Sequence, residues 1–252
     1  MIARLDSGRL ADGARLFSQR QAGEMWAAQT ILPVGNQPPS LTALQANFAA
    51  YGLGWVLRDY RGHKIVSHDG GLAGMTSRTL LVPDLKLGIV MLTNAEQPVY
   101  APLGYELLDH FFGVPRTDWV TRFHDRLVQG EMQAAAVVGA QAAARDTASR
   151  PSLPLAKYSG NYHDDLYGDA TITLEGDHLV LRFSRSPAFT GDLAHWQYDT
   201  FKANWRTANI AEAFVTFALH PDGSIEHFKM AAVSPLADFS FDYQDLRFVP
   251  AR

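Results

Sequence analysis

The chain has 252 residues, of which 47% are hydrophobic, so it is long enough to bury a substantial core as one large domain or two smaller ones. Its 22 basic and 26 acidic residues give a formal net charge of −4 without any block of like charge, which excludes the electrostatic footprint of a nucleic-acid or anionic-membrane binder. Because there is no cysteine, disulfides, thiolate metal sites and a cysteine nucleophile are also excluded.

The first thirty residues predict a helix, a turn and a second helix. Asp12-Gly13 is a turn signal, and Ser18 with Gln21 three residues later forms a capping-box pattern that opens the second helix. A loop rich in proline follows, after which Ser40 is expected to cap a short helix over 40–48.

From Tyr51 onward the periodicity changes to that of strands, and then returns to that of a helix. Turn signals at 59–62 and 83–86 separate runs of alternating or apolar residues. The expected strands cover 51–60, 63–68, 76–82 and 87–94. This order predicts a meander of antiparallel strands, and the helical spacing of apolar residues over 98–112 predicts a helix that packs on the sheet.

The second half of the chain changes character twice. Residues 116–154 are rich in alanine and glutamine and predict a helical linker, which RPSLP at 150–154 ends. Residues 155–252 contain many short strands separated by turns, which is typical of a small antiparallel barrel. The predicted fold class is therefore α+β: an antiparallel sheet with packed helices in a domain over 1–115, then the linker, then the barrel.

Membrane, metal and cofactor sites are not indicated. Charges interrupt the first residues where a signal peptide would be apolar, and the run at 134–144 is too short to span a bilayer. The acidic group His163, Asp164 and Asp165 with Asp169 lacks the rhythm of a calcium loop, so a solvated turn is the favoured interpretation. We expect no metal and no cofactor. The aromatic side chains over 196–205 are expected in the core, although a barrel interior is able to hold a small ligand.

Local patterns for a nucleophile are absent from the sequence. No serine is followed three residues later by lysine, and neither Tyr-x-Asn nor Gly-x-Ser-x-Gly occurs. The run His68-Asp69-Gly70-Gly71 interrupts a strand with two glycines. Two interpretations stay open for this run: a β-bulge, or a strand end whose uncovered N–H groups form part of an oxyanion hole.

Three motifs in order resemble one family. YGLGW at 51–55, HDGGLAGM at 68–75 and LVPDLKLGIVMLTN at 81–94 resemble the last third of serine β-lactamase-like hydrolases, the group of class C β-lactamases, D,D-peptidases, D-aminopeptidases and related esterases that includes peptidase S12. The start of the chain is similar to the segment upstream of these motifs, so the match covers about 1–113. The tail from Leu155 is similar to the lipocalin-like barrel often appended to this family. The resemblance implies part of a β-lactamase/transpeptidase-like fold.

The resemblance also implies roles for four residues. His68, Asp69 and Gly70 match the family's Lys/His-x-Gly motif, although the family more often has Thr or Ser where Asp69 stands. Gly71 falls where the family uses a backbone N–H as an oxyanion donor. His68 and Gly71 are therefore expected to be catalytic, with His68 the electropositive or hydrogen-bonding group that faces the substrate, and Asp69 and Gly70 are expected to bind substrate.

The family's Ser-x-x-Lys and tyrosine motifs precede the matching segment, so the chain resembles the C-terminal piece of a hydrolase of esters, amides or D-amino-acid peptides. By itself it is expected to be inactive, and to act on a small-molecule or peptide substrate only when completed. Its uncovered sheet edge is expected to pair with a second copy, another fragment or the barrel. The expected protein is soluble, and a periplasmic or cytoplasmic location stays open. The alternative is a non-catalytic binding or regulatory protein that uses the barrel or the exposed sheet, and a metal-dependent enzyme ranks third.

Overall fold

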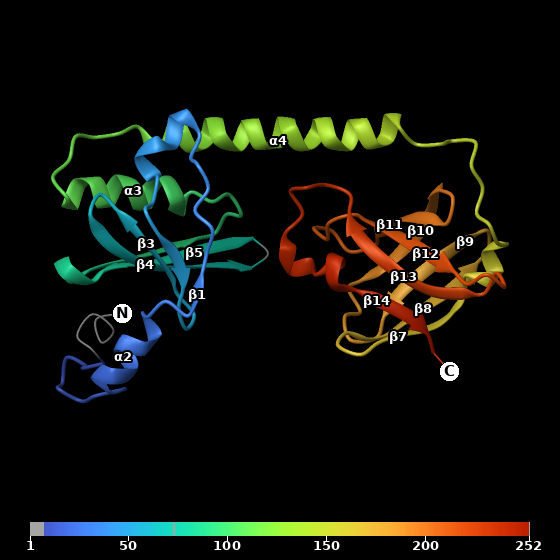
Figure 1. Cartoon of the computed structure of the whole chain (residues 1–252), viewed down its shortest axis with the longest axis horizontal. Helices are drawn as coiled ribbons and strands as arrows, with labels where there is room; N and C mark the ends of the chain where they lie inside the picture. Colours follow the sequence, from blue (N-terminus) through green and yellow to red (C-terminus); the bar gives the residue numbers. More distant parts are fainter. Residues whose placement is uncertain (1–7, 73, 252) are drawn as a thin grey trace. The chain divides into compact units, whose positions relative to one another are not determined.

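A computed structural model describes residues 8–72 and 74–251. The chain divides into two compact units, residues 1–127 and 128–252, and the helix α4 (Trp119–Ala143) passes from one to the other (Figure 1). This is the helix expected between 116 and 154; the three-part domain division itself stays a prediction. Among the described helices, none has the length and apolar character needed to cross a membrane.

The first unit contains a six-stranded sheet in the order β1 to β6, and every pairing joins neighbours in the chain as antiparallel strands. The strands are β1 (Thr30–Ile31), β2 (Ala49–Tyr51), β3 (Val56–Tyr60), β4 (His63–Leu72), β5 (Met75–Val82) and β6 (Leu87–Thr93). The predicted meander is confirmed. The single strand expected over 51–60 is wrong, because Gly52 N–H donates to the Trp55 carbonyl and closes a turn between β2 and β3.

Each face of this sheet has its own apolar cluster. On one face Ile65 and Leu80 pack with Leu108 of α3 (Tyr100–Phe111), the helix predicted over 98–112. On the other face Val66 and Leu81 pack with the end of α2 (Gln19–Met25). Because side chains alternate along a strand, these clusters show which residues of β4 share a face.

Helix α2 begins as the sequence predicts. The Ser18 hydroxyl accepts from the N–H of Gln21 at 3.2 Å, and the Gln21 side chain accepts from the N–H of Ser18 at 3.0 Å, which is the expected capping box. The predicted turn at Asp12-Gly13 is also confirmed, with a φ of 87° at Gly13. The first expected helix falls largely on residues 1–7, outside the described residues.

The helix expected over 40–48 is wrong in its cap and in its length. The element is a 3₁₀ helix over Pro39–Leu44 that has Pro38 as N-cap and no side-chain cap. Proline at the first helical position needs no N–H partner and already has a helical φ, so two successive prolines start the element one residue before Ser40. Further 3₁₀ helices cover Pro83–Leu85, Leu155–Lys157, Phe239–Phe241 and Tyr243–Asp245.

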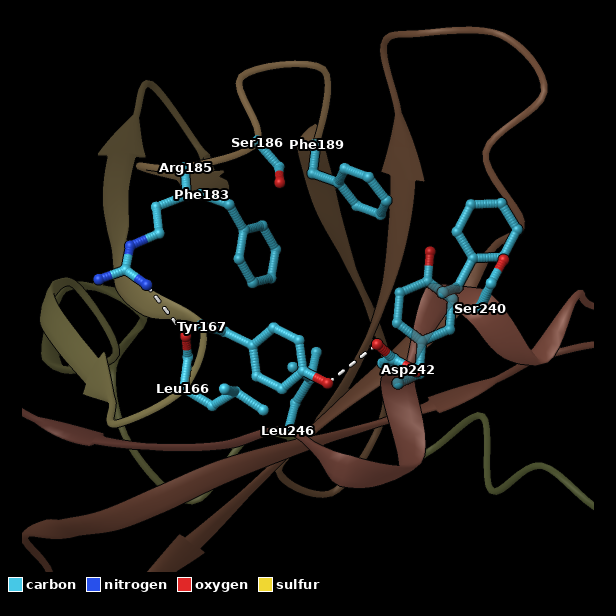
Figure 2. Close-up of a pocket in the computed structure, with 11 residues that line it drawn as sticks. Leu166, Tyr167, Phe183, Arg185, Ser186, Phe189, Ser240, Asp242 and Leu246 are labelled. Atoms are coloured by element: carbon cyan, nitrogen blue, oxygen red, sulfur yellow. Dashed lines mark hydrogen bonds between the residues drawn. The ribbon is translucent and has the colours of Figure 1, made fainter. Parts of the chain in front are cut away.

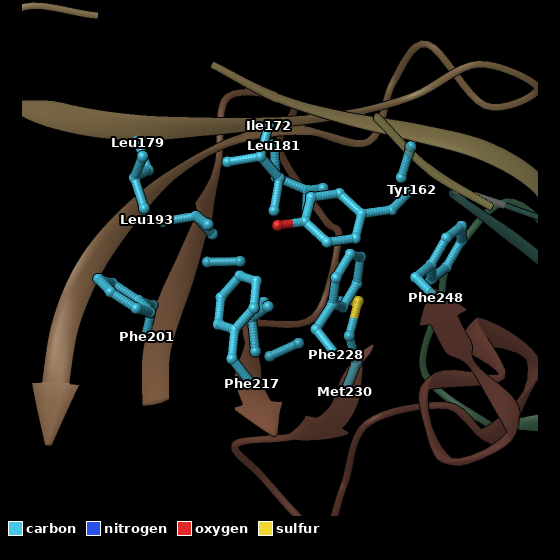
Figure 3. Packing of buried hydrophobic residues seen from close by; sticks show 14 of the residues in the cluster. Tyr162, Ile172, Leu179, Leu181, Leu193, Phe201, Phe217, Phe228, Met230 and Phe248 are labelled. Atoms are coloured by element: carbon cyan, nitrogen blue, oxygen red, sulfur yellow. The ribbon is translucent and has the colours of Figure 1, made fainter. Parts of the chain in front are cut away.

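The second unit is a closed antiparallel barrel of eight strands, as predicted. Its strands are β7 (Gly160–Asp164), β8 (Gly168–Glu175), β9 (His178–Phe183), β10 (Thr190–Gln197), β11 (Thr200–Trp205), β12 (Ala213–Leu219), β13 (Ile225–Ala232) and β14 (Arg247–Pro250). Figure 3 shows buried rings in contact inside the barrel: the centroid of Phe228 on β13 lies 5.1 Å from that of Tyr162 on β7 and 4.9 Å from that of Phe248 on β14. Side chains fill the middle of the barrel.

Candidate active-site wall

The four residues that the sequence singled out lie on β4, and β4 continues through them without interruption. His68 faces Thr79, Gly70 faces Ser77 and Gly71 faces Thr76 on β5, with no shift of register. The bulge interpretation is therefore wrong. The two glycines belong to a regular antiparallel ladder, so an irregular backbone is not the reason for glycine at these positions. The reason lies in the space and the contacts around each glycine.

The open edge of β4 begins beyond Ser67, which faces Val56, the first residue of β3. Tyr60 and His63 face each other across a two-residue turn, and the pair that closes such a turn exchanges both of its hydrogen bonds. Along an antiparallel strand, the backbone N–H and C=O groups of successive residues point alternately to the two sides of the strand. Every second N–H from His63 onward therefore points toward the side of β3. Within the described residues β4 has only β3 and β5 as neighbours, and its pairing with β3 stops at Ser67. The N–H groups of Asp69 and Gly71 therefore point to an edge without a ladder partner.

An independent contact supports the same orientation of the Gly71 N–H. The N–H of Thr76 donates to the hydroxyl of Thr93 on β6 at 3.3 Å, and the Thr76 carbonyl accepts from that hydroxyl at 3.0 Å. Both backbone groups of Thr76 thus point away from β4. Gly71, which faces Thr76, consequently turns its own N–H and carbonyl away from β5.

The two glycines differ in the space around them. A methyl group built on Gly71 meets nothing within 4 Å, so the strand surface there is open. A methyl group on Gly70 would lie 2.6 Å from the Ser77 hydroxyl oxygen, which is closer than side-chain carbons approach. Gly70 therefore permits the close approach of Ser77, whereas Gly71 leaves room for a group from elsewhere.

His68 and Tyr51 form a polar pair at the start of this open edge. The Tyr51 hydroxyl lies 3.0 Å from Nε2 of His68, and the two rings meet edge to face with centroids 6.3 Å apart. His68 is exposed and shares its face of β4 with Val66. Sequence reasoning did not identify Tyr51 as a site residue, although it begins the YGLGW motif on which the family resemblance partly rests.

The carboxylate of Asp69 lies on the other face of the sheet, where it binds Arg78. Its two oxygens accept from Nε and Nη2 of Arg78 at 2.6 and 3.1 Å, and the guanidinium lies 5.0 Å from the ring centre of Tyr100. Burial and then the charge of Asp69 raise the pKa of Tyr100. The side chain of Asp69 is thus engaged within the protein, while its backbone N–H belongs to the open edge. Its contact with substrate stays a prediction.

The acidic group at the start of the barrel has a structural arrangement. Asp164 is buried and accepts from the N–H groups of Leu166, Tyr167 and Arg247, so it ties a turn to β14. His163 contacts Asp169 at 2.7 Å. Across the residues that the structure describes, no group of three or more metal-binding side chains is assembled.

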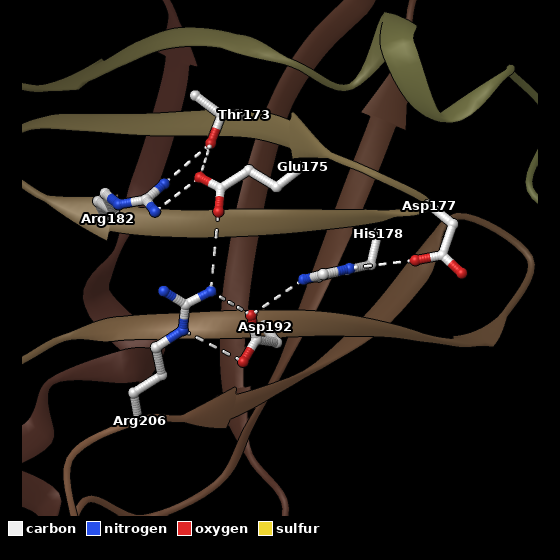
Figure 4. A network of polar contacts seen from close by, with 7 residues as sticks. All are labelled: Thr173, Glu175, Asp177, His178, Arg182, Asp192 and Arg206. Atoms are coloured by element: carbon white, nitrogen blue, oxygen red, sulfur yellow. Dashed lines mark hydrogen bonds and ion pairs between the residues drawn. The ribbon is translucent and has the colours of Figure 1, made fainter.

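A second cluster of charges lies on the outside of the barrel (Figure 4). Arg206 binds Asp192 at 2.6 Å, Arg182 binds Glu175 at 2.6 Å, and His178 contacts Asp192 at 3.2 Å. The hydrogen bond from Arg206 holds the pKa of Asp192 below its usual range. Since opposite charges alternate across neighbouring strands, this cluster supports the sheet surface and leaves little net charge for a ligand.

Comparison with known proteins agrees with the motifs on β2 to β6. Residues 7–110 match the family described as β-lactamase, and residues 144–250 match a domain of unknown function, DUF3471. Residues 7–110 are therefore β-lactamase-like. The β-lactamase-like unit therefore contains the sheet, α2, α3 and the open edge of β4, and the barrel forms most of the second matched segment.

Two curated relatives and one solved structure show the extent of the likeness. Unguisins hydrolase ungD of Aspergillus violaceofuscus is 29% identical over 214 residues, covering 79% of this chain and 37% of that protein. Unguisins hydrolase ungD' of Aspergillus campestris is 30% identical over 175 residues, covering 66% and 31%. The octameric penicillin-binding protein homologue from Pyrococcus abyssi is 14% identical, with a TM-score of 0.38 over 98% of this chain and 44% of that one. The chain spans about a third of the length of the curated relatives.

Proposed function

We propose that the β-lactamase-like unit forms one wall of the acyl-transfer site of a serine hydrolase, which cleaves an ester, an amide or a D-amino-acid peptide through an acyl-enzyme. The observation that carries this proposal is the N–H of Gly71 on β4, which has no ladder partner among the described strands, together with the open space at the Cβ position of Gly71 and the hydrogen-bonded pair of His68 and Tyr51. The curated relatives are named as hydrolases, which supports the reaction class.

Each residue of the wall has a distinct part in this proposal. The Gly71 N–H donates to the oxygen that becomes negative as the acyl carbon turns tetrahedral, and a fixed donor stabilises that charge without reorganisation. His68 donates a hydrogen bond to the substrate, and Tyr51 orients its ring. Gly70 lets Ser77 pack close, and Asp69 binds substrate through its backbone while its carboxylate holds Arg78.

The nucleophile is proposed to come from outside these 252 residues. None of the serines in the chain belongs to Ser-x-x-Lys or Gly-x-Ser-x-Gly, and none of the tyrosines to Tyr-x-Asn. An oxyanion donor and a histidine stabilise the transition state but form no acyl bond. The wall consequently gives no turnover until a serine with its base completes it.

A first experiment tests the source of the nucleophile. The purified chain is incubated with p-nitrophenyl acetate and, separately, with a chromogenic cephalosporin, and intact-mass spectrometry then detects any acyl adduct. We expect neither turnover nor adduct. A stoichiometric adduct on one serine of this chain would overturn the proposal that the nucleophile lies elsewhere.

A second experiment tests the wall in any protein that contains these residues and shows turnover. Gly71→Ala keeps the N–H and places a methyl group in open space, whereas Gly71→Pro removes the N–H. Loss of one oxyanion donor lowers kcat by about a hundredfold or more, so we expect that loss for Gly71→Pro and near-parental kcat for Gly71→Ala. Equal kcat in the two variants would contradict the role given to the N–H.

A non-catalytic binding protein is the second candidate. It is favoured by apolar side chains at the tip of β4 and β5, where Leu72 is 73% and Met75 is 50% exposed beside the unpaired edge. Such an edge pairs readily with another strand, including that of a second copy. Light scattering over a range of concentrations is expected to show association, and a monomer at every concentration would count against self-pairing.

A further inference from the structure

A pocket of about 250 Å³ opens at one end of the barrel, apart from the filled interior (Figure 2). This volume equals the share of roughly eight water molecules in the liquid, which is enough for a small organic molecule. The pocket lies wholly within the second unit, so it is independent of the function proposed for the β-lactamase-like unit. Its lining residues are Leu166, Tyr167, Phe183, Arg185, Ser186, Phe189, Ser240, Phe241, Asp242, Tyr243 and Leu246.

Aromatic rings form most of the wall. The centroid of Phe189 lies 5.9 Å from that of Phe183 and 6.0 Å from that of Phe241, which stacks on Tyr243 at 5.6 Å. These three phenylalanines are only partly buried, and all three line the pocket. Rigid rings held against one another present apolar surface to a ligand at little cost in side-chain entropy.

One cation lies at the rim without an acidic partner. Arg185 donates from Nη1 to the Leu166 carbonyl at 3.0 Å, and in the described part of the chain it makes no ion pair. A guanidinium has five N–H groups in a planar fork that matches a carboxylate, so this one bond leaves donors free. Gly168 has a φ of 81°, and a methyl group there would lie 2.7 Å from Nε of Arg185. The backbone thus makes room for the guanidinium at this place.

The acidic group of the pocket is already engaged. Asp242 accepts from the Tyr167 hydroxyl at 2.9 Å, and this hydrogen bond raises the pKa of Tyr167. Asp242 also has a φ of 54°, in a region that residues other than glycine seldom occupy. Figure 2 shows the Tyr167 ring between this carboxylate and Arg185, so the negative charge lies on the far side of the pocket from the free donors.

We propose that this pocket binds a small monocarboxylate with an apolar body. The apolar body lies among Phe183, Phe189 and Phe241, and the carboxylate accepts from the free N–H groups of Arg185. A second negative charge on the ligand would approach Asp242 and is therefore disfavoured. A neutral or cationic ligand of the same shape leaves Arg185 without a new partner and binds more weakly.

Trp205 provides the readout, since its ring lies 5.2 Å from that of Phe189 and stacks on Tyr243. The chain is titrated with 4-phenylbutyrate and with the neutral 4-phenylbutanamide while tryptophan fluorescence is recorded. Because the chain has five tryptophans, the same titration of Trp205→Phe assigns the signal to this site. A charge-assisted hydrogen bond makes the expected affinity for the carboxylate about tenfold higher, or more, than that for the amide.

Variants locate the interaction. Arg185→Gln is expected to lower the affinity for the carboxylate to that for the amide, whereas Arg150→Gln, at an exposed arginine outside the pocket, leaves both unchanged. Phe189→Ala is expected to weaken both ligands. Circular dichroism confirms that each variant is folded. Equal affinity for the two ligands, unaltered carboxylate affinity in Arg185→Gln, or no saturable signal up to the solubility of 4-phenylbutyrate would each overturn the proposal.

Discussion

The hydroxyl of Tyr51 lies 3.0 Å from Nε2 of His68, although the two residues are 17 positions apart in the sequence. Tyr51 is the last residue of β2, and β3 lies between that strand and β4 in the sheet. A ring nitrogen that is already hydrogen-bonded fixes the orientation of the imidazole and leaves the other nitrogen for a further partner. In the proposed function, Nδ1 of His68 is therefore the atom that would contact the substrate.

We predict that Tyr51→Phe disturbs His68 without unfolding the sheet. A single partly exposed hydrogen bond contributes about 1 kcal/mol, so stability changes little, and turnover in a complete enzyme falls by roughly tenfold or less. Two-bond ¹H–¹⁵N spectra of the histidines report the loss directly through the Nε2 signal of His68. Tyr198→Phe, at an exposed tyrosine of the barrel, is the matched control. Unchanged His68 signals in Tyr51→Phe would disprove the contact in solution.

The two glycines are predicted to respond oppositely to alanine. Gly71→Ala adds a methyl group in open space and reduces the freedom of the unfolded chain, so it leaves stability unchanged or raises it by up to about 1 kcal/mol. Gly70→Ala forces the Ser77 hydroxyl to move and is expected to be destabilising by about 1 kcal/mol. Urea denaturation measures both changes in the free energy of unfolding.

Removing the Ser77 hydroxyl supplies the control for that prediction. In a Ser77→Ala background the atom nearest to the new methyl group is gone, so Gly70→Ala is expected to cost less there than in the parent. The same penalty in both backgrounds would show that Ser77 is not what requires a glycine at this position.

The sequence predicted the sheet well because β3 to β6 follow local alternation and end at turn signals. It predicted the place of the wall from His68 to Gly71, but not its geometry. Whether β4 contains a bulge depends on its pairing with β5. Whether the Gly71 N–H has a ladder partner depends on how far along β4 the pairing with β3 extends. Both are matters of register between strands, which local patterns do not determine. Tyr51 was missed for the same reason.

A buried acid on α3 escaped sequence reasoning as well. Asp109 is 2% exposed and accepts from the Tyr60 hydroxyl at 2.6 Å, from Nε of Arg61 at 2.8 Å and from Nε1 of Trp119 at 2.8 Å. In the sequence it is one aspartate in an amphipathic helix, where solvent exposure is the usual expectation. Its partners come from a hairpin 49 residues earlier and from the start of α4.

We predict that Asp109→Ala destabilises the first unit strongly. It leaves a buried hydroxyl and an indole N–H without an acceptor and a partly buried guanidinium without its counter-charge, so the expected loss is about 3 kcal/mol. Asp109→Asn keeps an acceptor and is expected to lose less. Asp125→Asn, at an exposed aspartate of α4, is the control and should stay within about 0.5 kcal/mol in urea denaturation. A loss of that small size in Asp109→Ala would contradict the network.

The acid sensitivity of the barrel is predicted from Asp199. Burial alone would raise the pKa of this carboxyl, but hydrogen bonds from the Tyr158 hydroxyl and from the hydroxyl and N–H of Ser152 outweigh burial and lower the pKa below 3.8. A group whose pKa is lowered by folding stabilises the native state fully above its ordinary pKa, and that contribution is lost as the pH falls through the folded value. The stability that Asp199 supplies should therefore decline progressively below about pH 5.

Asp199→Asn isolates this contribution. At about pH 7 the variant is expected to unfold at a lower temperature than the parent, because it lacks the ionised acceptor between Ser152 and Tyr158. As the pH falls through the lowered pKa of Asp199, the two proteins should converge, since the parent carboxyl then gains a proton as well. Asp165→Asn, at a fully exposed aspartate of the same unit, should match the parent at every pH. Thermal unfolding followed by circular dichroism measures all three, and a gap between parent and Asp199→Asn that stays constant from neutral to acid pH would refute the assignment.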